Sequence, residues 1–130
     1  MANLLNDIAS YLAEENDLVP GTSIFYNEMP ENEITTVLVQ ETFMGGHVLQ
    51  QINAELHRVR ITARGLSSTA AETILRSCYT SLLSESGVIE LTANNFATIE
   101  LQGTPIWEKT DQQGRSFFYF TAVVISSRIN

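Results

Sequence analysis

The sequence predicts an α+β domain, with a mainly antiparallel β-sheet and two α-helices packed on one of its faces. Two segments have the apolar spacing of amphipathic helices, and each precedes a group of β-branched and aromatic segments. The connections between these segments have hairpin length, which favours antiparallel neighbours. No internal repeat or linker occurs, and we expect residues 1–130 to form a single domain.

The first half of the chain predicts one helix and three strands. Leu5, Ile8 and Leu12 recur at helical spacing and make one apolar face, and Pro20-Gly21 ends this segment. Runs rich in β-branched residues are typical of strands. The expected elements are a helix over 3–16 and strands over 24–26, 35–42 and 50–63.

A glycine pair separates two of these strands. Gly45-Gly46 centres residues 42–50, which we expect to be a flexible loop, because glycine adopts many conformations and no apolar run anchors the segment. We expect this loop to become ordered on contact with a neighbouring subunit or a tube. Its candidate contact residues are Met44, Gly45, Gly46 and His47.

The strand over 50–63 changes phase along its length. Ala54 and Leu56 share one parity, whereas Val59 and Ile61 share the other. Because successive strand residues point to opposite faces, this change predicts a β-bulge near His57.

The second half predicts one helix and three strands. Thr69 begins a capping-box pattern, and the helix that follows has an apolar stripe that includes Leu75 and Leu82 and stops at Gly87. Asp111-Gln112-Gln113-Gly114 has the composition of a bulged hairpin turn. The expected strands cover 96–101, 105–110 and 117–127.

The last of these strands is apolar on both faces. Residues 117–125 contain no charged residue, no Gly and no Pro, whereas a half-exposed strand alternates apolar and polar side chains. A helix layer covers one face only, so we expect a neighbouring subunit to cover the other, as in an assembly protein. The two faces carry Phe117, Tyr119, Val123 and Ile125 on one side and Phe118, Phe120, Ala122 and Val124 on the other.

The composition is that of a globular protein made in a reducing compartment. Hydrophobic residues make up 44% and charged residues 17% of the chain, values that exclude wholesale disorder. The single cysteine, Cys78, excludes an internal disulfide framework. The first residues include Asp7 and lack the basic start of a signal peptide, and no apolar run reaches the ~20 residues that span a bilayer. We expect a soluble protein with no membrane association, made in the cytoplasm.

Negative charge is concentrated in the first half of the chain. The formal net charge is -8, and residues 1–57 contain nine acidic residues but no Lys or Arg. Because affinity for phosphates comes mainly from Lys and Arg, this half argues against nucleic-acid binding. Two interpretations stay open: a solubilising surface, or a surface past which DNA moves without adhering.

The sequence does not indicate an enzyme. His47 and His57 are the only histidines, and Cys78 lies on the apolar stripe of the second helix, where a packed thiol is expected. Gly45-Gly46 is followed by neither the Lys nor the helix start of a phosphate-binding loop. We expect no catalytic residue, no cofactor and no metal ion.

Two features are candidates for binding other proteins. Arg58, Arg60 and Arg64 alternate along one strand and form either a solvated face with cross-strand Glu partners or an ionic seam for the acidic half of an adjacent subunit. Trp107, on a hairpin, either packs at an edge or anchors an interface. With the aromatic strand, the candidate subunit-interface residues are Arg58, Arg60, Arg64, Trp107, Phe118, Tyr119 and Phe120.

Several segments match a known family in the expected order. The first are residues 24–30 (Ile-Phe-Tyr-Asn-Glu-Met-Pro), followed by the strand 36–41, then residues 59–65 (Val-Arg-Ile-Thr-Ala-Arg-Gly) and the helix 70–83. The last are residues 103–107 (Gly-Thr-Pro-Ile-Trp), residues 111–115 and the aromatic strand. In this succession, which covers nearly the whole chain, the sequence resembles the tail terminator proteins of long-tailed bacteriophages, often labelled minor capsid or tail completion proteins.

The resemblance implies a structural virion protein of the tail or neck, made in the host cytoplasm. It implies a homo-oligomeric ring, usually six-fold, that contacts the tail tube protein, terminates the tube and joins it to the head–tail connector protein. DNA would pass through the lumen without specific binding. The alternatives are a connector or neck protein of the same virion, or a cellular α+β adaptor that binds a partner at a sheet edge.

Overall fold

The structure is a computed structural model that describes residues 4–29, 35–49, 54–83, 87–92 and 95–127. Side chains are described over the same ranges except residues 43–49, 92, 95 and 127. Two helices and six strands follow one another along the chain: α1 (Leu4–Asn16), β1 (Ile24–Tyr26), β2 (Thr36–Leu49), β3 (Ala54–Gly65), α2 (Ser68–Leu82), β4 (Val88–Thr92), β5 (Asn95–Thr110) and β6 (Ser116–Ser127).

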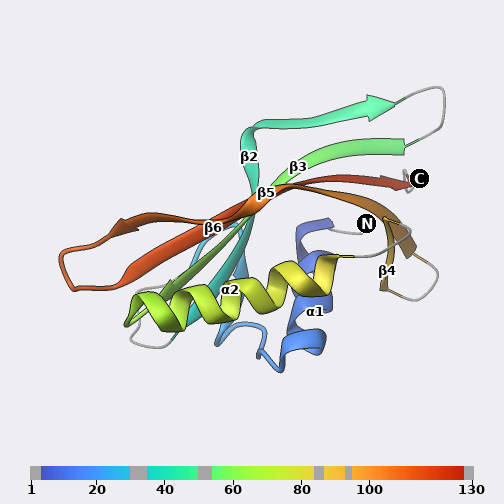
Figure 1. Ribbon diagram of the computed structural model, residues 1–130. Coiled ribbons are helices and arrows are strands. Elements are labelled where there is room, and N and C mark those ends of the chain that lie inside the picture. Colours follow the sequence, from blue (N-terminus) through green and yellow to red (C-terminus); the bar gives the residue numbers. More distant parts are fainter. Residues whose placement is uncertain (1–3, 30–34, 50–53, 84–86, 93–94, 128–130) are drawn as a thin grey trace.

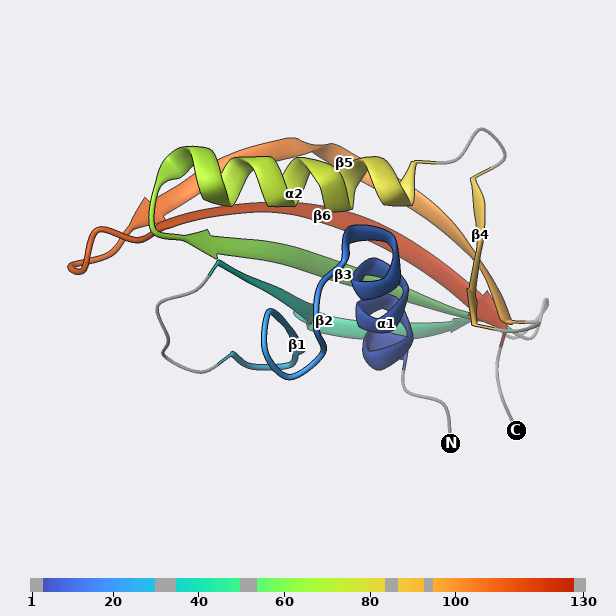
Figure 2. The same ribbon diagram turned by 90° about the horizontal axis from the view of Figure 1, so that it is seen from below.

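The strands form one sheet in the order β1-β2-β3-β6-β5-β4. All neighbouring pairs are antiparallel except β1 and β2, which run parallel. Both helices lie on the same side of the curled sheet, as Figures 1 and 2 show from two directions. The prediction of an α+β fold with a mainly antiparallel sheet is therefore confirmed.

The core lies between the helices and the two central strands. Val59 and Ile61 of β3 stand opposite Ala122 and Phe120 of β6, and all four are almost completely buried. The ring of Tyr79 from α2 meets the Phe120 ring edge to face, with centroids 5.3 Å apart. The side of the sheet that carries these residues is called the helix face below, and the opposite side is called the outer face.

Helix α2 begins two residues earlier than its capping-box pattern predicts. Ser67, not Thr69, is the N-cap, and its hydroxyl accepts a hydrogen bond from the Ala70 N–H at 3.1 Å. The helix starts shortly after the end of β3 in the sequence. Gly65, the last residue of β3, lies so close to the helix that an added Cβ would be 2.7 Å from the Ala71 nitrogen. The helix ends at Leu82, before the predicted stop at Gly87.

The segment predicted as a glycine loop is part of β2. This strand continues through Gly45-Gly46 to Leu49, because the far half of β3 supplies a hydrogen-bonding partner for residues 46–49. The loop assignment of Met44, Gly45, Gly46 and His47 is therefore wrong, and residue 50 lies outside the described residues. In Figure 1 this end of β2 extends beyond the helix layer together with β3.

The predicted β-bulge lies in β2 and not in β3. Between the pairs Glu41↔Val59 and Gly46↔His57, β2 residues 42–45 face the single residue Arg58. β3 itself pairs with β6 in unbroken register from Ala54 to Gly65. The change of parity in β3 has another cause. The far half of this strand extends past the helices, so its side chains no longer alternate between buried and exposed positions.

Two features of the second half were not predicted. Residues 88–92 form strand β4, whose Ile89 and Leu91 are buried. The two strands expected over 96–101 and 105–110 are one strand, β5, with a register shift between Gln102 and Ile106. Gly103 lies within this shift at φ 86°, a conformation that favours glycine.

The burial of Leu75 leads to a prediction. Leu75 is fully buried beneath α2, so Leu75→Ala is expected to lower the free energy of unfolding by ~2–5 kcal/mol through lost contacts and a cavity. Chemical denaturation measures this change. Thr73→Ala, at an exposed position of the same helix, is the matched control and should leave stability nearly unchanged; an equal effect of both variants would contradict this orientation of α2.

Candidate functional site

The two apolar faces of β6 have different surroundings. Phe118 and Phe120, 9% and 1% exposed, lie on the helix face. Phe117, Tyr119 and the other odd-numbered residues of β6 lie on the outer face, are only partly buried, and have no helix over them (Figure 2). Phe118 and Phe120 are therefore core residues and leave the set of candidate interface residues, whereas Tyr119 remains in it.

Arg60 is held by its own chain. Its Nη2 lies 2.6 Å from the Glu108 Oε1 of β5, and its guanidinium lies 3.9 Å from the centre of the Tyr119 ring of β6. An ion pair and a cation–π contact thus connect three strands across the outer face. This matches the interpretation of the arginine stripe as a face with cross-strand Glu partners.

The other two arginines of the stripe differ from Arg60 and from each other. Arg64 is 2% exposed and lies beside the buried residues Thr62 and Thr36, so it is not part of a solvated or open seam. Arg58 is partly buried on the outer face, opposite Val123 of β6. Only Arg58 therefore remains as a stripe arginine that is available to a partner.

Unsatisfied polar atoms accompany these arginines. Arg60 Nε, Thr62 Oγ1 and Thr42 Oγ1 are buried and have no hydrogen-bond partner in the part of the chain that the structure describes. Leaving a buried polar group without a partner costs about 1–3 kcal/mol. These atoms are enclosed within the chain, so they add to the cost of packing this part of the sheet.

Trp107 is exposed to solvent on the β5–β6 hairpin. It is 56% exposed and its neighbour Ile106 is 49% exposed, so Trp107 does not pack in the core. In the same hairpin, the Lys109 Nζ lies 4.8 Å from the centre of the Phe117 ring. Figure 1 shows this hairpin extending past one end of α2.

The turn of this hairpin is tightly hydrogen-bonded. Asp111 Oδ1 accepts hydrogen bonds from the Gln113 and Arg115 N–H groups, and its Oδ2 accepts one from Arg115 Nε at 2.8 Å. Desolvation alone would raise the pKa of Asp111, but these hydrogen bonds and the Arg115 charge together lower it. Gly114 adopts φ 81°, as the predicted bulged turn requires.

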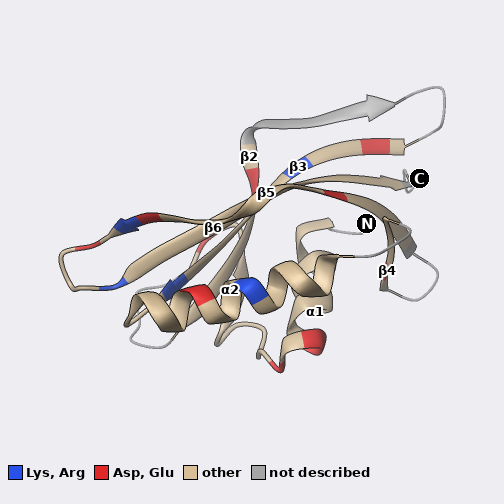
Figure 3. Cartoon of the chain, in the orientation of Figure 1, with Lys and Arg blue, Asp and Glu red and all other residues tan. Residues whose placement is uncertain are grey.

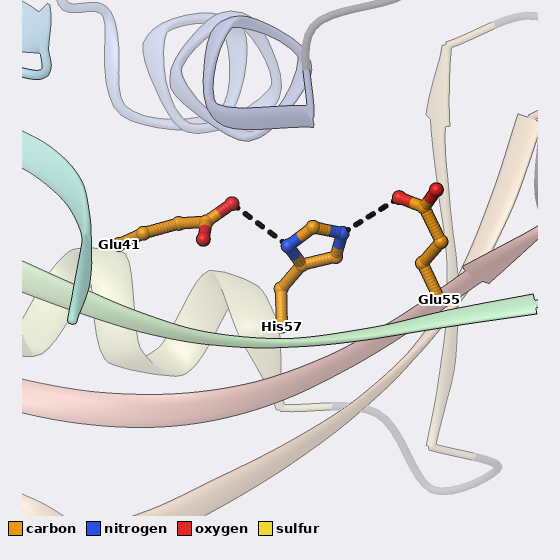
Figure 4. A network of polar contacts seen from close by, with 3 residues as sticks. All are labelled: Glu41, Glu55 and His57. Carbon is orange, nitrogen blue, oxygen red and sulfur yellow. Dashed lines mark hydrogen bonds and ion pairs between the residues drawn. The ribbon is translucent and has the colours of Figure 1, made fainter. Parts of the chain in front are cut away.

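His57 connects two carboxylates at the end of the helix face (Figure 4). Its Nδ1 lies 2.7 Å from Glu41 Oε1 of β2, and its Nε2 lies 2.9 Å from Glu55 Oε1 of β3. Because carboxylate oxygens only accept, both contacts are hydrogen bonds only when both ring nitrogens carry protons. The cluster joins the two strands beside the irregular segment of β2.

The arrangement of this cluster is not that of a metal site. No group of three or more His, Cys, Asp or Glu side chains among the described residues is arranged to hold a metal ion. The Cys78 thiol is buried in the core beneath α2, where desolvation raises its pKa to about 12. The Cys78 thiol is therefore not an activated nucleophile.

Acidic residues gather at one end of α1 (Figure 3). Glu14, Glu15 and Asp17 are exposed, and the last turn of this helix contains no basic residue. These three residues are called the acidic helix end below. They lie on the helix side of the sheet, away from the arginines of β3.

No family model matches the sequence, and no curated protein matches it. None of the helices in the described ranges is long and apolar enough to cross a membrane. The function must therefore be argued from the surface, of which the outer face and its arginines are the most distinctive part.

The His57 cluster leads to a prediction about stability. His57→Ala removes the ring that contacts both Glu41 and Glu55, so we expect the free energy of unfolding to fall by ~1–2 kcal/mol. Urea denaturation measures this change. Glu72→Gln, which removes an exposed ion pair within α2, should change stability by less than about 0.5 kcal/mol; a larger effect of the control than of His57→Ala would contradict the cluster's role.

Cys78 provides a test of core packing. With a pKa near 12, its thiol at pH 8 is deprotonated in roughly one molecule in ten thousand, and it is also shielded. We expect iodoacetamide to modify Cys78 at least ~100-fold more slowly in the folded protein than in urea. Mass spectrometry measures the extent of modification. Rapid modification of the folded protein would show that the packing of α2 does not shield this thiol from solvent.

Proposed function

We propose that the protein is a structural virion protein that forms a homo-oligomeric ring, terminates a phage tail tube and joins it to the head–tail connector. The observation that carries this proposal is the outer face, where the apolar half of β6 has no helix over it. Burying apolar surface contributes about 25 cal/mol per Å², so further burial of the partly exposed Phe117, Tyr119, Val123 and Ile125 by a neighbouring copy would stabilise an interface. The resemblance of the sequence to tail terminators supplies the particular assembly.

The distribution of charge supports the same proposal. The first 57 residues have no Lys or Arg, and the chain as a whole has a net charge of -8. A ring lined by such a surface would let DNA pass through its lumen without specific binding, because phosphates are repelled and find few cations. A connector or neck ring of the same virion would use this property equally, and it is the second candidate.

A cellular adaptor is the candidate from a different class. β4 is a sheet edge with a strand on one side only among the described residues, and such an edge accepts a peptide by strand addition. An adaptor of this kind would be a monomer or a dimer, whereas the proposed terminator forms a larger closed ring. The two candidates therefore differ in mass.

The test is the assembly state of the purified protein, alone and with purified tail tubes. Native mass spectrometry and negative-stain microscopy should show rings with a mass of about six subunits, either free or at one end of the tubes. The proposal fails if the protein stays monomeric or dimeric and leaves both ends of the tubes bare.

Substitutions on the two faces of β6 separate folding from assembly. Phe118→Asp places a charge in the core and should unfold the domain. Tyr119→Asp places a charge on the outer face and should leave a folded subunit that no longer forms rings. Circular dichroism measures folding, and sedimentation measures assembly; if both variants unfold, or if Tyr119→Asp assembles normally, the outer face is not the interface.

A further inference from the structure

Arg58 differs from every other described cation. Arg60, Arg76 and Arg115 form ion pairs with Glu108, Glu72 and Asp111. Lys109 contacts an aromatic ring, and Arg64 also has an interaction within the chain. Among the Lys and Arg residues that the structure describes, Arg58 alone has a side chain with no hydrogen bond, ion pair or ring contact, although the residue is partly buried.

The surroundings of Arg58 also contain polar atoms without partners. Arg60 Nε and Thr62 Oγ1 follow it on the same face of β3, and Thr42 Oγ1 belongs to the β2 segment that faces it. Thr62 is 5% exposed. Solvent therefore reaches it poorly, and its hydroxyl has no partner among the described residues. These atoms are enclosed within the chain, so Arg58 is the group of this cationic surface that another molecule can reach. Arg58 and the surface around it are called the Arg58 patch below.

The acidic helix end carries negative charge and contains no cationic residue. The C-terminal end of a helix carries the negative pole of its dipole, so acidic residues there are unfavourable unless a cation is near. Glu14, Glu15 and Asp17 are exposed there, and no Lys or Arg occurs in residues 1–57. Burial raises the pKa of Tyr11, and the charge of Glu15 raises it further, which indicates that this negative field extends into α1.

The two surfaces cannot meet within one chain. α1 packs against β1, β2, β4 and α2 on the helix side of the sheet (Figure 1), whereas the register of β3 with β6 places Arg58 on the outer face. The sheet stands between them. A contact between these surfaces therefore has to join two copies of the chain.

Building on the proposed ring, we propose that the Arg58 patch of one subunit binds the acidic helix end of the next copy. The two surfaces are different, so their contact is heterologous, the type that closes rings. Carboxylates supply the acceptors that the Arg58 guanidinium needs. Such a pair sets the orientation and register of neighbours as well as their affinity.

The test uses two charge-reversal proteins. One carries Arg58→Glu, and the other carries Glu14→Lys, Glu15→Lys and Asp17→Lys together. Each should fold, as judged by circular dichroism, and each should need a concentration about tenfold or more above that of the wild type for assembly at physiological salt. Arg76→Glu, at an exposed position on α2, reverses a charge elsewhere and should assemble like the wild type.

Mixing the two proteins gives the decisive result. Around a mixed ring, the glutamate introduced by Arg58→Glu in the first protein would meet the lysines introduced in the second. The native Arg58 of the second protein would meet the native acidic helix end of the first. Equimolar mixing should therefore restore rings of alternating subunits, seen by native mass spectrometry as complexes with equal numbers of both chains. Two folded variants that stay unassembled after mixing would overturn the proposed pairing.

Other outcomes separate the possible failures. If both variants assemble like the wild type, the pairing is wrong but the proposed ring stands; if the wild type itself never assembles, the proposed function fails first. If Arg58→Glu assembles normally but loses binding of a short DNA duplex that the wild type retains, the occupant is a phosphate and the pairing is overturned. If Arg58→Glu does not fold, Arg58→Gln replaces it. Normal assembly of Arg58→Gln would overturn the pairing.

Discussion

The structure depends on the fact that two helices can cover only one face of a six-stranded sheet. The central strand β6 is apolar on both faces, so covering one of them leaves the other in contact with solvent. The chain places Phe118, Phe120 and Val124 beneath the helices, where they are buried together with Val59 and Ile61 of β3. The helix face thus provides most of the buried core, whereas the outer-face residues of β6 are only partly buried.

The outer face is stabilised in part by polar contacts within the chain. Arg60 stacks on Tyr119 and pairs with Glu108. The guanidinium therefore covers an aromatic ring that would otherwise be more exposed to solvent. Such contacts lower the tendency of the face to associate unspecifically, because charged groups on a sheet oppose random aggregation. Among the described arginines of this face, Arg58 is the one whose side chain has no such contact.

Local sequence patterns predicted much of the fold because their causes are local. The helix periodicity at Leu5, Ile8 and Leu12 and the turn at Asp111 and Gly114 depend on neighbouring residues, and the structure contains both. The path of β2 through Gly45-Gly46 depends on β3, a separate strand that supplies its hydrogen bonds. A glycine pair alone is a loop signal, and no local feature reports that a partner strand is present.

The candidate site shows the same division. The alternation of Arg58, Arg60 and Arg64 on one face was readable from the sequence, but their unequal surroundings were not. Glu108, which pairs with Arg60, lies far along the chain, and the burial of Arg64 depends on the packing of the sheet. The choice between the two faces of β6 also required the position of α2. Strand β4 has a short alternating pattern, with Ile89 and Leu91 buried, that is typical of a strand and is visible in the sequence.

The pairing of β3 with β6 also determines when the sheet can form. Ala54 pairs with Ser127 and Gly65 with Ser116, so the centre of the sheet joins segments that are far apart in sequence. Closing such long loops is entropically costly and slows folding. A growing chain cannot complete its core until β6 has left the ribosome, and until then β2 and β3 expose an apolar face without its final partner. The chain is therefore most vulnerable to misassociation during its synthesis.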